Sequence, residues 1–139
     1  MSDARYLLDT NIVSEPMRPD PSRRVLRLLQ RHEHEVAIAS VVWHELRFGM
    51  ESLPDSRRRS RIENYLQNVV LATMPILDYD GRAAEWHASE RARLAARGET
   101  PPFVDGQIAA VASVHDLFLV TQNDAHFRRF HGLRVVTWR

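Results

Sequence analysis

Acidic and amide side chains follow two short apolar runs that are typical of buried strands. Asp9 comes directly after the run 6–8, and Asn123 and Asp124 follow the run 117–121. In α/β folds, ligands bind beyond the carboxyl ends of the parallel strands. The pattern therefore predicts that these side chains lie at one edge of a sheet, where they are placed for chemistry.

Two further acids fall on predicted helices. The helical neighbours of Glu45 include Val41, Val42 and Phe48, so Glu45 is predicted to share a core-facing side with apolar residues. A carboxylate in that position needs a partner or a bound cation. Asp105 opens an alanine-rich helix and is predicted to point along the core edge; a helix N-terminus favours an ionised carboxylate by roughly 0.3–1 kcal/mol.

Carboxylates gathered at one site repel one another, and their pKa values rise unless a cation binds. Hard oxygen ligands suit Mg²⁺ or Mn²⁺. Such an ion can polarise a phosphoryl oxygen and lower the pKa of a water molecule, which makes phosphodiester hydrolysis the natural reaction. Each acid also has a purely structural interpretation: a strand-end turn for Asp9, a helix cap for Asp105 or Asp124, and an ion pair with Arg47 or another arginine for Glu45.

Five short apolar runs alternate with helical patterns along the chain. Strands are predicted at 5–8, 36–40, 74–78, 117–121 and 134–138. Helices are predicted after a Ser22 cap, after a Ser40 cap, from Asp55 or Ser56, over 80–97 and over 105–115. The strands are continuously apolar, as in sheets that are covered on both faces. We therefore predict a single α/β domain over residues 1–139, with a mainly parallel sheet of four to five strands.

The composition narrows the classes of function. All 19 basic residues are arginine, which removes phosphate-binding and Schiff-base lysines. The absence of cysteine removes disulfides, thiol nucleophiles and thiolate ligands. No G-x-G-x-x-G motif for a dinucleotide is present. No apolar run approaches the roughly 18 residues of a membrane span and no signal peptide is evident, so a cytoplasmic protein is expected.

Four motifs in order carry a family resemblance that covers essentially the whole chain. They are "LLDTNIVSEPMRP" at 7–19, "HEL" with "RFG" at 44–49, "VDGQIAA" at 104–110, and "LVTQN" with "HF" at 119–127. The chain resembles the PIN-domain nucleases, and among them the VapC-type toxins of toxin–antitoxin pairs, in particular the FitB variety. The resemblance implies a PIN-like α/β/α sandwich.

The resemblance also implies site residues. Three acids match the family's metal-binding positions: Asp9, Glu45 and Asp105. Three polar residues match positions around that site: Thr10, Asn11 and Thr121. The family's fourth acidic position falls at Asn123, with Asp124 beside it. Whether Asn123 or Asp124 completes the site, and whether one or two metals bind, stays open.

The resemblance implies a Mg²⁺- or Mn²⁺-dependent endoribonuclease that cuts structured RNA, such as tRNA or rRNA, and so arrests translation. It further implies a homodimer and an antitoxin that binds across the active-site groove. The antitoxin would carry a DNA-binding domain, so that operator DNA is contacted only through it. The alternative is a weakly active PIN-like module that acts with its antitoxin as a DNA-bound regulatory complex, which the amide at Asn123 motivates.

Some exposed basic residues are candidates for contacts with RNA phosphates. They are Arg57, Arg58 and Arg59 in "DSRRRSR", and Arg128 and Arg129 near the last strand. A solvated helix face is the other interpretation of the first group. His126, next to Phe127 near the site, is a candidate for contact with substrate, and an ordinary surface histidine is the preferred interpretation.

Overall fold

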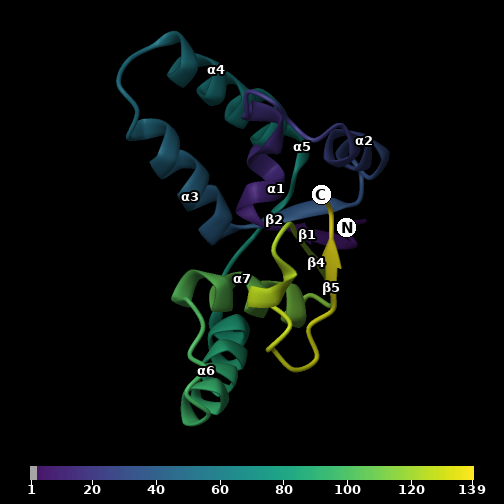
Figure 1. The fold of residues 1–139 in the computed structure, drawn as a ribbon, viewed down its shortest axis with the longest axis vertical. Coiled ribbons are helices and arrows are strands. Elements are labelled where there is room, and N and C mark those ends of the chain that lie inside the picture. Colours follow the sequence, from purple (N-terminus) through teal and green to yellow (C-terminus); the bar gives the residue numbers. More distant parts are fainter. Residues whose placement is uncertain (1–2) are drawn as a thin grey trace.

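The computed structural model describes residues 3–139, and in that range the strands form one five-stranded parallel sheet in the order β3-β2-β1-β4-β5 (Figure 1). The strands are β1 (Tyr6–Leu8), β2 (Val36–Ala39), β3 (Ile76–Leu77), β4 (Phe118–Thr121) and β5 (Val135–Thr137). In the middle of the sheet, Leu7 pairs with Ala37 of β2 and Leu119 of β4. The predicted parallel α/β sheet is confirmed.

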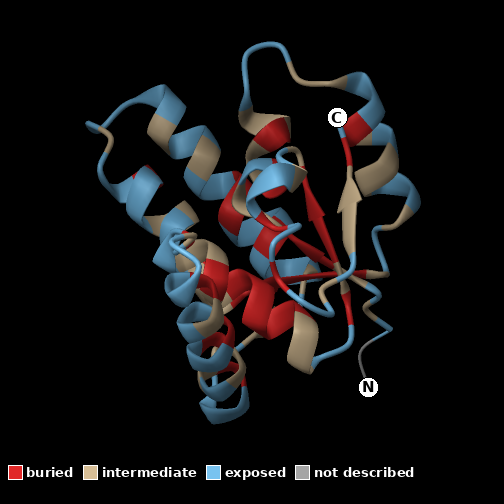
Figure 2. Cartoon of the chain, turned by 60° about the horizontal axis from the view of Figure 1, so that its bottom comes forward, coloured by how far each residue is buried: buried red, intermediate tan, exposed pale blue. Residues whose placement is uncertain are grey.

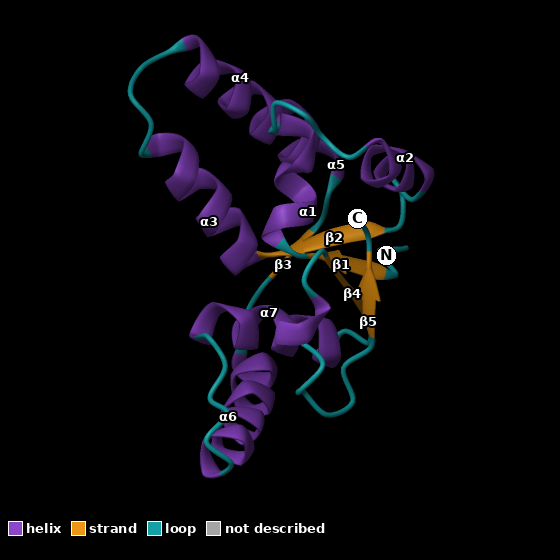
Figure 3. Cartoon of the chain, in the orientation of Figure 1, coloured by secondary structure: helices purple, strands orange, loops and turns teal. Residues whose placement is uncertain are grey.

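Helices cover both faces of the sheet. The α-helices are α1 (Thr10–Ser14), α2 (Arg23–Arg31), α3 (Ser40–Glu51), α4 (Arg57–Tyr65), α5 (Leu71–Thr73), α6 (Gly81–Ala96) and α7 (Phe103–Val114). Two 3-10 helices, η1 (Glu15–Met17) and η3 (Asp124–His126), and one π-helical turn, η2 (Leu66–Val70), complete the described elements. Helices α1 to α5 lie on one side of the sheet, and α6 and α7 on the other (Figures 1 and 3).

The core lies between the sheet and its helices, and the central strands β1, β2 and β4 are among its most deeply buried parts, whereas the edge strands β3 and β5 are half-buried (Figure 2). All four residues of β2 are buried, which explains why its sequence lacks polar alternation. On α7, Ala109, Ala110 and Ala112 are fully buried, and their small side chains allow the helix to pack closely. No helix in residues 3–139 combines the length and the apolar character that crossing a membrane requires.

Serine caps begin two of the predicted helices. The side chains of Ser22 and Ser56 accept hydrogen bonds from backbone N–H groups in the first turns of α2 and α4. The predicted Ser40 cap is wrong. Ala39 is the N-cap of α3, and the Ser40 hydroxyl instead accepts a bond from the backbone N–H of Tyr79 at 3.3 Å. Ser40 thereby joins α3 to the segment that follows β3.

The strand order creates a reversal point beside β1. The chain moves from β1 outward to β2 and β3, and then returns across the sheet to β4. The carboxyl ends of β1 and β4 therefore lie side by side where the winding direction changes, which is the usual position of a ligand site. The pairing extends one residue past β1, because the Asp9 N–H donates to the Val120 carbonyl at 2.8 Å.

Candidate active site

A cavity of about 430 Å³ opens at the carboxyl ends of β1 and β4. Six of the predicted site residues line it: Asp9, Thr10, Asn11, Glu45, Asp105 and Asn123. His126 and Phe127 complete its wall on the side of η3. The fold thus brings together side chains that are more than 100 positions apart in the sequence.

Asp9 is held by two hydrogen bonds. Its Oδ1 accepts from the Thr10 N–H at 2.8 Å, and its Oδ2 accepts from the Thr121 hydroxyl at 2.9 Å. The same hydroxyl oxygen accepts from the Asn123 N–H at 3.0 Å. Burial raises the pKa of Asp9, the two hydrogen bonds oppose that rise, and the neighbouring Asp105 carboxylate adds to it. Thr121 therefore orients both Asp9 and the segment that carries Asn123.

Asp105 lies in the first turn of α7. The helix begins two residues before the predicted start and has no side-chain cap, so Asp105 is not occupied as a cap. Its Oδ2 is 3.3 Å from Nδ1 of His126. Burial raises the pKa of Asp105, and His126 opposes that rise. His126 thus lines the cavity beside Asp105, and its side chain is at the same time exposed at the surface, as expected from the sequence.

Glu45 is exposed, and the prediction of a core-facing side chain is wrong. Its helical neighbour Phe48 is 65% exposed, so this face of α3 does not pack on the sheet. Arg47, considered as a partner, pairs instead with Glu51 at 3.1 Å. Glu45 consequently stands at the rim of the cavity, and no hydrogen bond or ion pair engages its carboxylate within residues 3–139.

Asn123 and Asp124 occupy different environments. Asn123 lines the cavity, whereas Asp124 is not among the lining residues. The Asp124 carboxylate accepts from Nε of Arg128 at 2.7 Å, and this contact lowers its pKa. Of these two candidates, Asn123 alone lines the cavity.

Sequence reasoning missed a buried acid that supports this edge. Glu15 is 3% exposed and accepts from the Ser22 N–H at 2.9 Å and from the Gln122 side chain at 3.0 Å. Arg18 is 3.3 Å away. These bonds hold the loop after β4, immediately before Asn123, against η1. The signal in the sequence was a glutamate inside the first motif, followed by a proline.

A second buried group, His87, lies against the residue that follows Asp105. His87 of α6 is 2% exposed, and its Nδ1 is 2.9 Å from the Tyr79 hydroxyl. Its Nε2 has no hydrogen-bond partner in residues 3–139 and faces Gly106, where an added Cβ would lie only 2.1 Å away. Burial lowers the pKa of His87 and so favours the neutral ring. Gly106 is therefore required for the first turn of α7 to reach this position.

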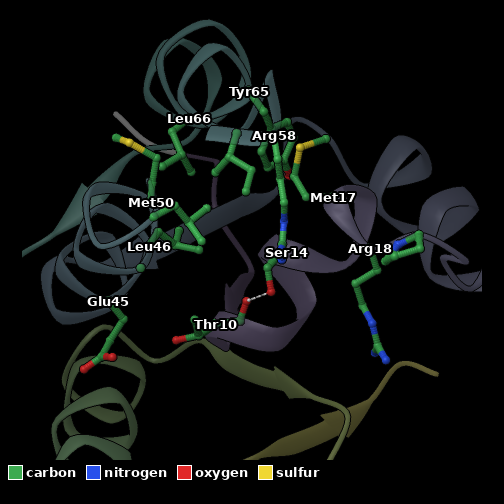
Figure 4. Close-up of a pocket in the computed structure, with 14 residues that line it drawn as sticks. Thr10, Ser14, Met17, Arg18, Glu45, Leu46, Met50, Arg58, Tyr65 and Leu66 are labelled. Carbon is green, nitrogen blue, oxygen red and sulfur yellow. Dashed lines mark hydrogen bonds between the residues drawn. The ribbon is translucent and has the colours of Figure 1, made fainter. Parts of the chain in front are cut away.

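An apolar groove of about 480 Å³ adjoins the acidic cavity (Figure 4). It runs between α1, α3 and α4, and its apolar lining includes Met17, Leu46, Met50 and Leu66. Thr10 and Glu45 line both the groove and the cavity, so the two are continuous. Arg18 and Arg58 add positive charge to its lining.

The arginines predicted to contact RNA differ in whether their side chains already bind another residue of the chain. Arg59 donates to the Leu53 carbonyl at 3.1 Å, and Arg128 is bound to Asp124. Within the described chain, the side chains of Arg57, Arg58 and Arg129 are exposed and make no hydrogen bond or ion pair. The last three remain available to a ligand.

The acids define a cation site only in part. In residues 3–139, no group of three or more His, Asp or Glu side chains is already gathered closely enough to enclose a metal ion. Asp9 and Asp105 are close enough to repel each other, and each has a raised pKa. Two half-buried carboxylates and an exposed third acid that lines the same cavity, all oxygen donors, fit a hard divalent cation.

Residues 6–133 match the PIN domain family, and the chain belongs to that family. Toxin FitB of Neisseria gonorrhoeae is 32% identical over 124 residues, which cover 87% of this chain and 89% of the relative. The tRNA(fMet)-specific endonuclease VapC of Shigella flexneri is 32% identical over 135 residues, covering 96% and 98% of the two chains.

Solved structures show the same fold. The crystal structure of FitAcB from Neisseria gonorrhoeae matches with a TM-score of 0.84 at 30% identity, covering 94% of this chain and 95% of that one. DNA-bound VapBC from Salmonella typhimurium matches with a TM-score of 0.85 at 27% identity, covering 98% and 99%. The predicted relation to VapC and FitB toxins is confirmed.

Proposed function

We propose that this chain is the endoribonuclease toxin of a toxin–antitoxin pair and that it hydrolyses phosphodiester bonds in structured RNA. The observation that carries the proposal is the pair of half-buried carboxylates of Asp9 and Asp105, both with raised pKa values, in a cavity at the sheet reversal point. Relatives named as ribonucleases, among them VapC ribonuclease Y4jK of Sinorhizobium fredii, support the same activity.

Mg²⁺ or Mn²⁺ is the proposed cofactor, held by Asp9 and Asp105 with Glu45 turning in from the rim. When bound, the ion would polarise a phosphoryl oxygen and lower the pKa of a water molecule. Thr121 keeps the Asp9 carboxylate aimed at the cavity through its 2.9 Å bond. Asn123 lines the same cavity, where its amide can position a water molecule or a phosphate oxygen.

The proposed partner is an antitoxin that binds the apolar groove between α1, α3 and α4. The groove is continuous with the acidic cavity through Thr10 and Glu45, so a peptide lying in it would obstruct substrate. The structures of FitAB bound to an IR36 DNA fragment and of DNA-bound VapBC support a partner that links such a toxin to DNA. A homodimer and a cytoplasmic location belong to the same proposal.

A second candidate function is regulation without appreciable cleavage. Asn123 replaces a carboxylate in the cavity, and several solved neighbours are complexes with DNA. In that case the chain would act through the antitoxin on operator DNA, and the purified toxin would leave RNA intact.

The two functions are separated by incubating purified protein with total RNA in Mg²⁺, Mn²⁺ or EDTA, beside Asp9→Asn and Asp116→Asn. Asp116 is an exposed acid outside the cavity and controls for the charge change. Discrete metal-dependent fragments from the parent and Asp116→Asn, absent with Asp9→Asn, support the ribonuclease. Intact RNA from folded, antitoxin-free protein under both metals supports the regulatory function.

A further inference from the structure

Helix α2 presents a dense basic face. Its nine residues, RRVLRLLQR, include four arginines, Arg23, Arg24, Arg27 and Arg31, and no acid. Val25 is buried and the two leucines 28 and 29 pack against the core, which fixes the helix on the body of the protein. All four arginines are exposed, so the guanidinium groups project into solvent from a firmly held element.

These arginines differ from most others in having no partner. Within residues 3–139, none of the four makes an ion pair or a side-chain hydrogen bond, and neither adjoining acid, Asp20 or Glu33, pairs with them. Elsewhere, carboxylates bind the arginines at positions 5, 18, 47, 93, 128 and 134. Since the net charge of the whole chain is only +1, this positive face is a local concentration and does not reflect an overall basic protein.

The placement is unfavourable for the isolated helix. Arg23, Arg27 and Arg31 repeat at four-residue intervals, where like charges on a helix repel. Arg23 and Arg24 also stand in the first turn, where the helix dipole disfavours cations. Both effects disappear when an external anion binds, so the face is suited to a negatively charged partner.

The face is also hollowed. A depression of about 630 Å³ is lined by Arg24, Arg27 and Arg31 together with Leu28 and Gln30. Guanidinium groups bind phosphate oxygens bidentately, and an apolar floor with an amide can accept a sugar. Helix α2 lies away from the first turn of α7, which carries Asp105, so the depression is separate from the acidic cavity (Figure 1).

We propose that the arginine face of α2 binds the phosphate backbone of the RNA substrate at a point remote from the bond that is cut. The proposal rests on the proposed ribonuclease function and adds a second contact with the substrate. Only an RNA whose length or fold lets it reach both the acidic cavity and the arginine face of α2 can make this contact. Affinity for such RNA then depends on α2, and cleavage of a short oligonucleotide does not.

The test compares Arg27→Gln/Arg31→Gln with Arg82→Gln/Arg97→Gln in an Asp9→Asn background, which prevents cleavage during binding. The second pair removes the same charge at the two ends of α6. Dissociation constants for a purified tRNA fraction are measured by fluorescence anisotropy from 50 to 300 mM salt. We expect the α2 variant to bind about tenfold more weakly and its log–log salt slope to fall by about 2, because two phosphate contacts are lost.

Two further measurements define the contact. Arg27→Lys/Arg31→Lys keeps the charge and should therefore keep the salt slope, with a smaller loss of affinity than the glutamine pair, because lysine cannot bind phosphate bidentately. In the active protein, Arg27→Gln/Arg31→Gln should raise KM for the folded RNA and leave kcat and the cleavage of a six-nucleotide oligomer unchanged. Circular dichroism checks that all the variants have the same fold, which is expected because glutamine is a good helix former.

An unchanged tRNA affinity and salt slope in the α2 variant would overturn the proposal, as would an equal loss in the α6 control. A loss confined to duplex DNA would also overturn it. If the parent cleaves no RNA while the α2 variant still binds tRNA more weakly, the ribonuclease function fails and the α2 contact stands. If the parent cleaves RNA and the α2 changes have no effect, the ribonuclease function stands and the α2 contact fails.

Discussion

Replacing Gly106 with alanine should displace the first turn of α7 and, with it, Asp105. The added Cβ would lie 2.1 Å from Nε2 and 2.6 Å from Cδ2 of His87. Ordinary contacts between such atoms are about 3.5–4.0 Å, so the ring or the helix must move by roughly 1.4–1.9 Å. The ring has little room, because it is 2% exposed, hydrogen-bonded to Tyr79 and packed on Phe103 at 4.9 Å between ring centroids.

Two opposing effects determine how much Gly106→Ala changes the free energy of unfolding. Overpacking a core typically costs about 1–3 kcal/mol. Alanine in place of glycine inside a helix returns about 1 kcal/mol. We therefore expect Gly106→Ala to lose up to about 2 kcal/mol of unfolding free energy, or up to roughly 6 °C in Tm. A shift of about 1 Å in a catalytic group can cost on the order of 100-fold in rate, so RNA cleavage should fall further than stability does.

The assays are thermal unfolding and the initial rate of RNA cleavage. Gly49→Ala on α3 is the matched control, because an added Cβ there has nothing within 4 Å and should stabilise the helix by about 0.5–1 kcal/mol. Combining His87→Ala with Gly106→Ala removes the clash, so the two changes should be less costly together than the sum of the single variants. A Gly106→Ala protein as stable and as active as Gly49→Ala would refute this account of α7.

Three smaller changes test the supports of the site. Glu15→Gln should make the free energy of unfolding less dependent on acid pH. The hydrogen bond from the Ser22 N–H holds the pKa of Glu15 below its ordinary value. The ionised carboxylate therefore stabilises the fold fully above the ordinary pKa, and this stabilisation is lost as pH falls through the folded pKa. Urea unfolding from pH 3 to 7 measures the difference, and parallel curves for the variant and the parent would contradict it. Thr121→Val removes a bond that lowers the pKa of Asp9, so the acid limb of the cleavage profile should move to higher pH; an unmoved limb opposes the assignment. Tyr65→Phe removes the 2.6 Å bond to the Val13 carbonyl and should cost about 1–2 kcal/mol by the same unfolding assay, and an unaffected protein would exclude that role.

The sheet and the residues at the ends of its strands could be predicted because local patterns determine them. Continuous apolar runs indicate strands covered on both faces, and a parallel sheet brings the carboxyl ends of those strands together. Asp9 and Asn123 follow such runs directly, so their meeting required only the order of the strands. The Ser22 cap was predictable for the same reason, since its partner lies three residues away.

The environment of individual side chains could not be predicted so well. Glu45 was expected to face the core because its neighbours are apolar, but periodicity does not say whether another element covers that face of the helix. The approach of His126 to Asp105 depends on the path of the chain after β4. The fit of His87 against Gly106 joins two helices through a contact that leaves no local pattern.

Binding of Mn²⁺ to the antitoxin-free protein tests the central claim most directly, because it does not depend on knowing the RNA target. Electron paramagnetic resonance would be used to titrate the parent, Asp9→Asn, Asp105→Asn and Asp124→Asn. We predict that the parent and Asp124→Asn bind the ion alike and that Asp9→Asn and Asp105→Asn lose it, since Asp9 and Asp105 line the cavity whereas Asp124 is bound to Arg128 outside it. Equal binding by all four proteins, or a loss only with Asp124→Asn, would contradict the site described above.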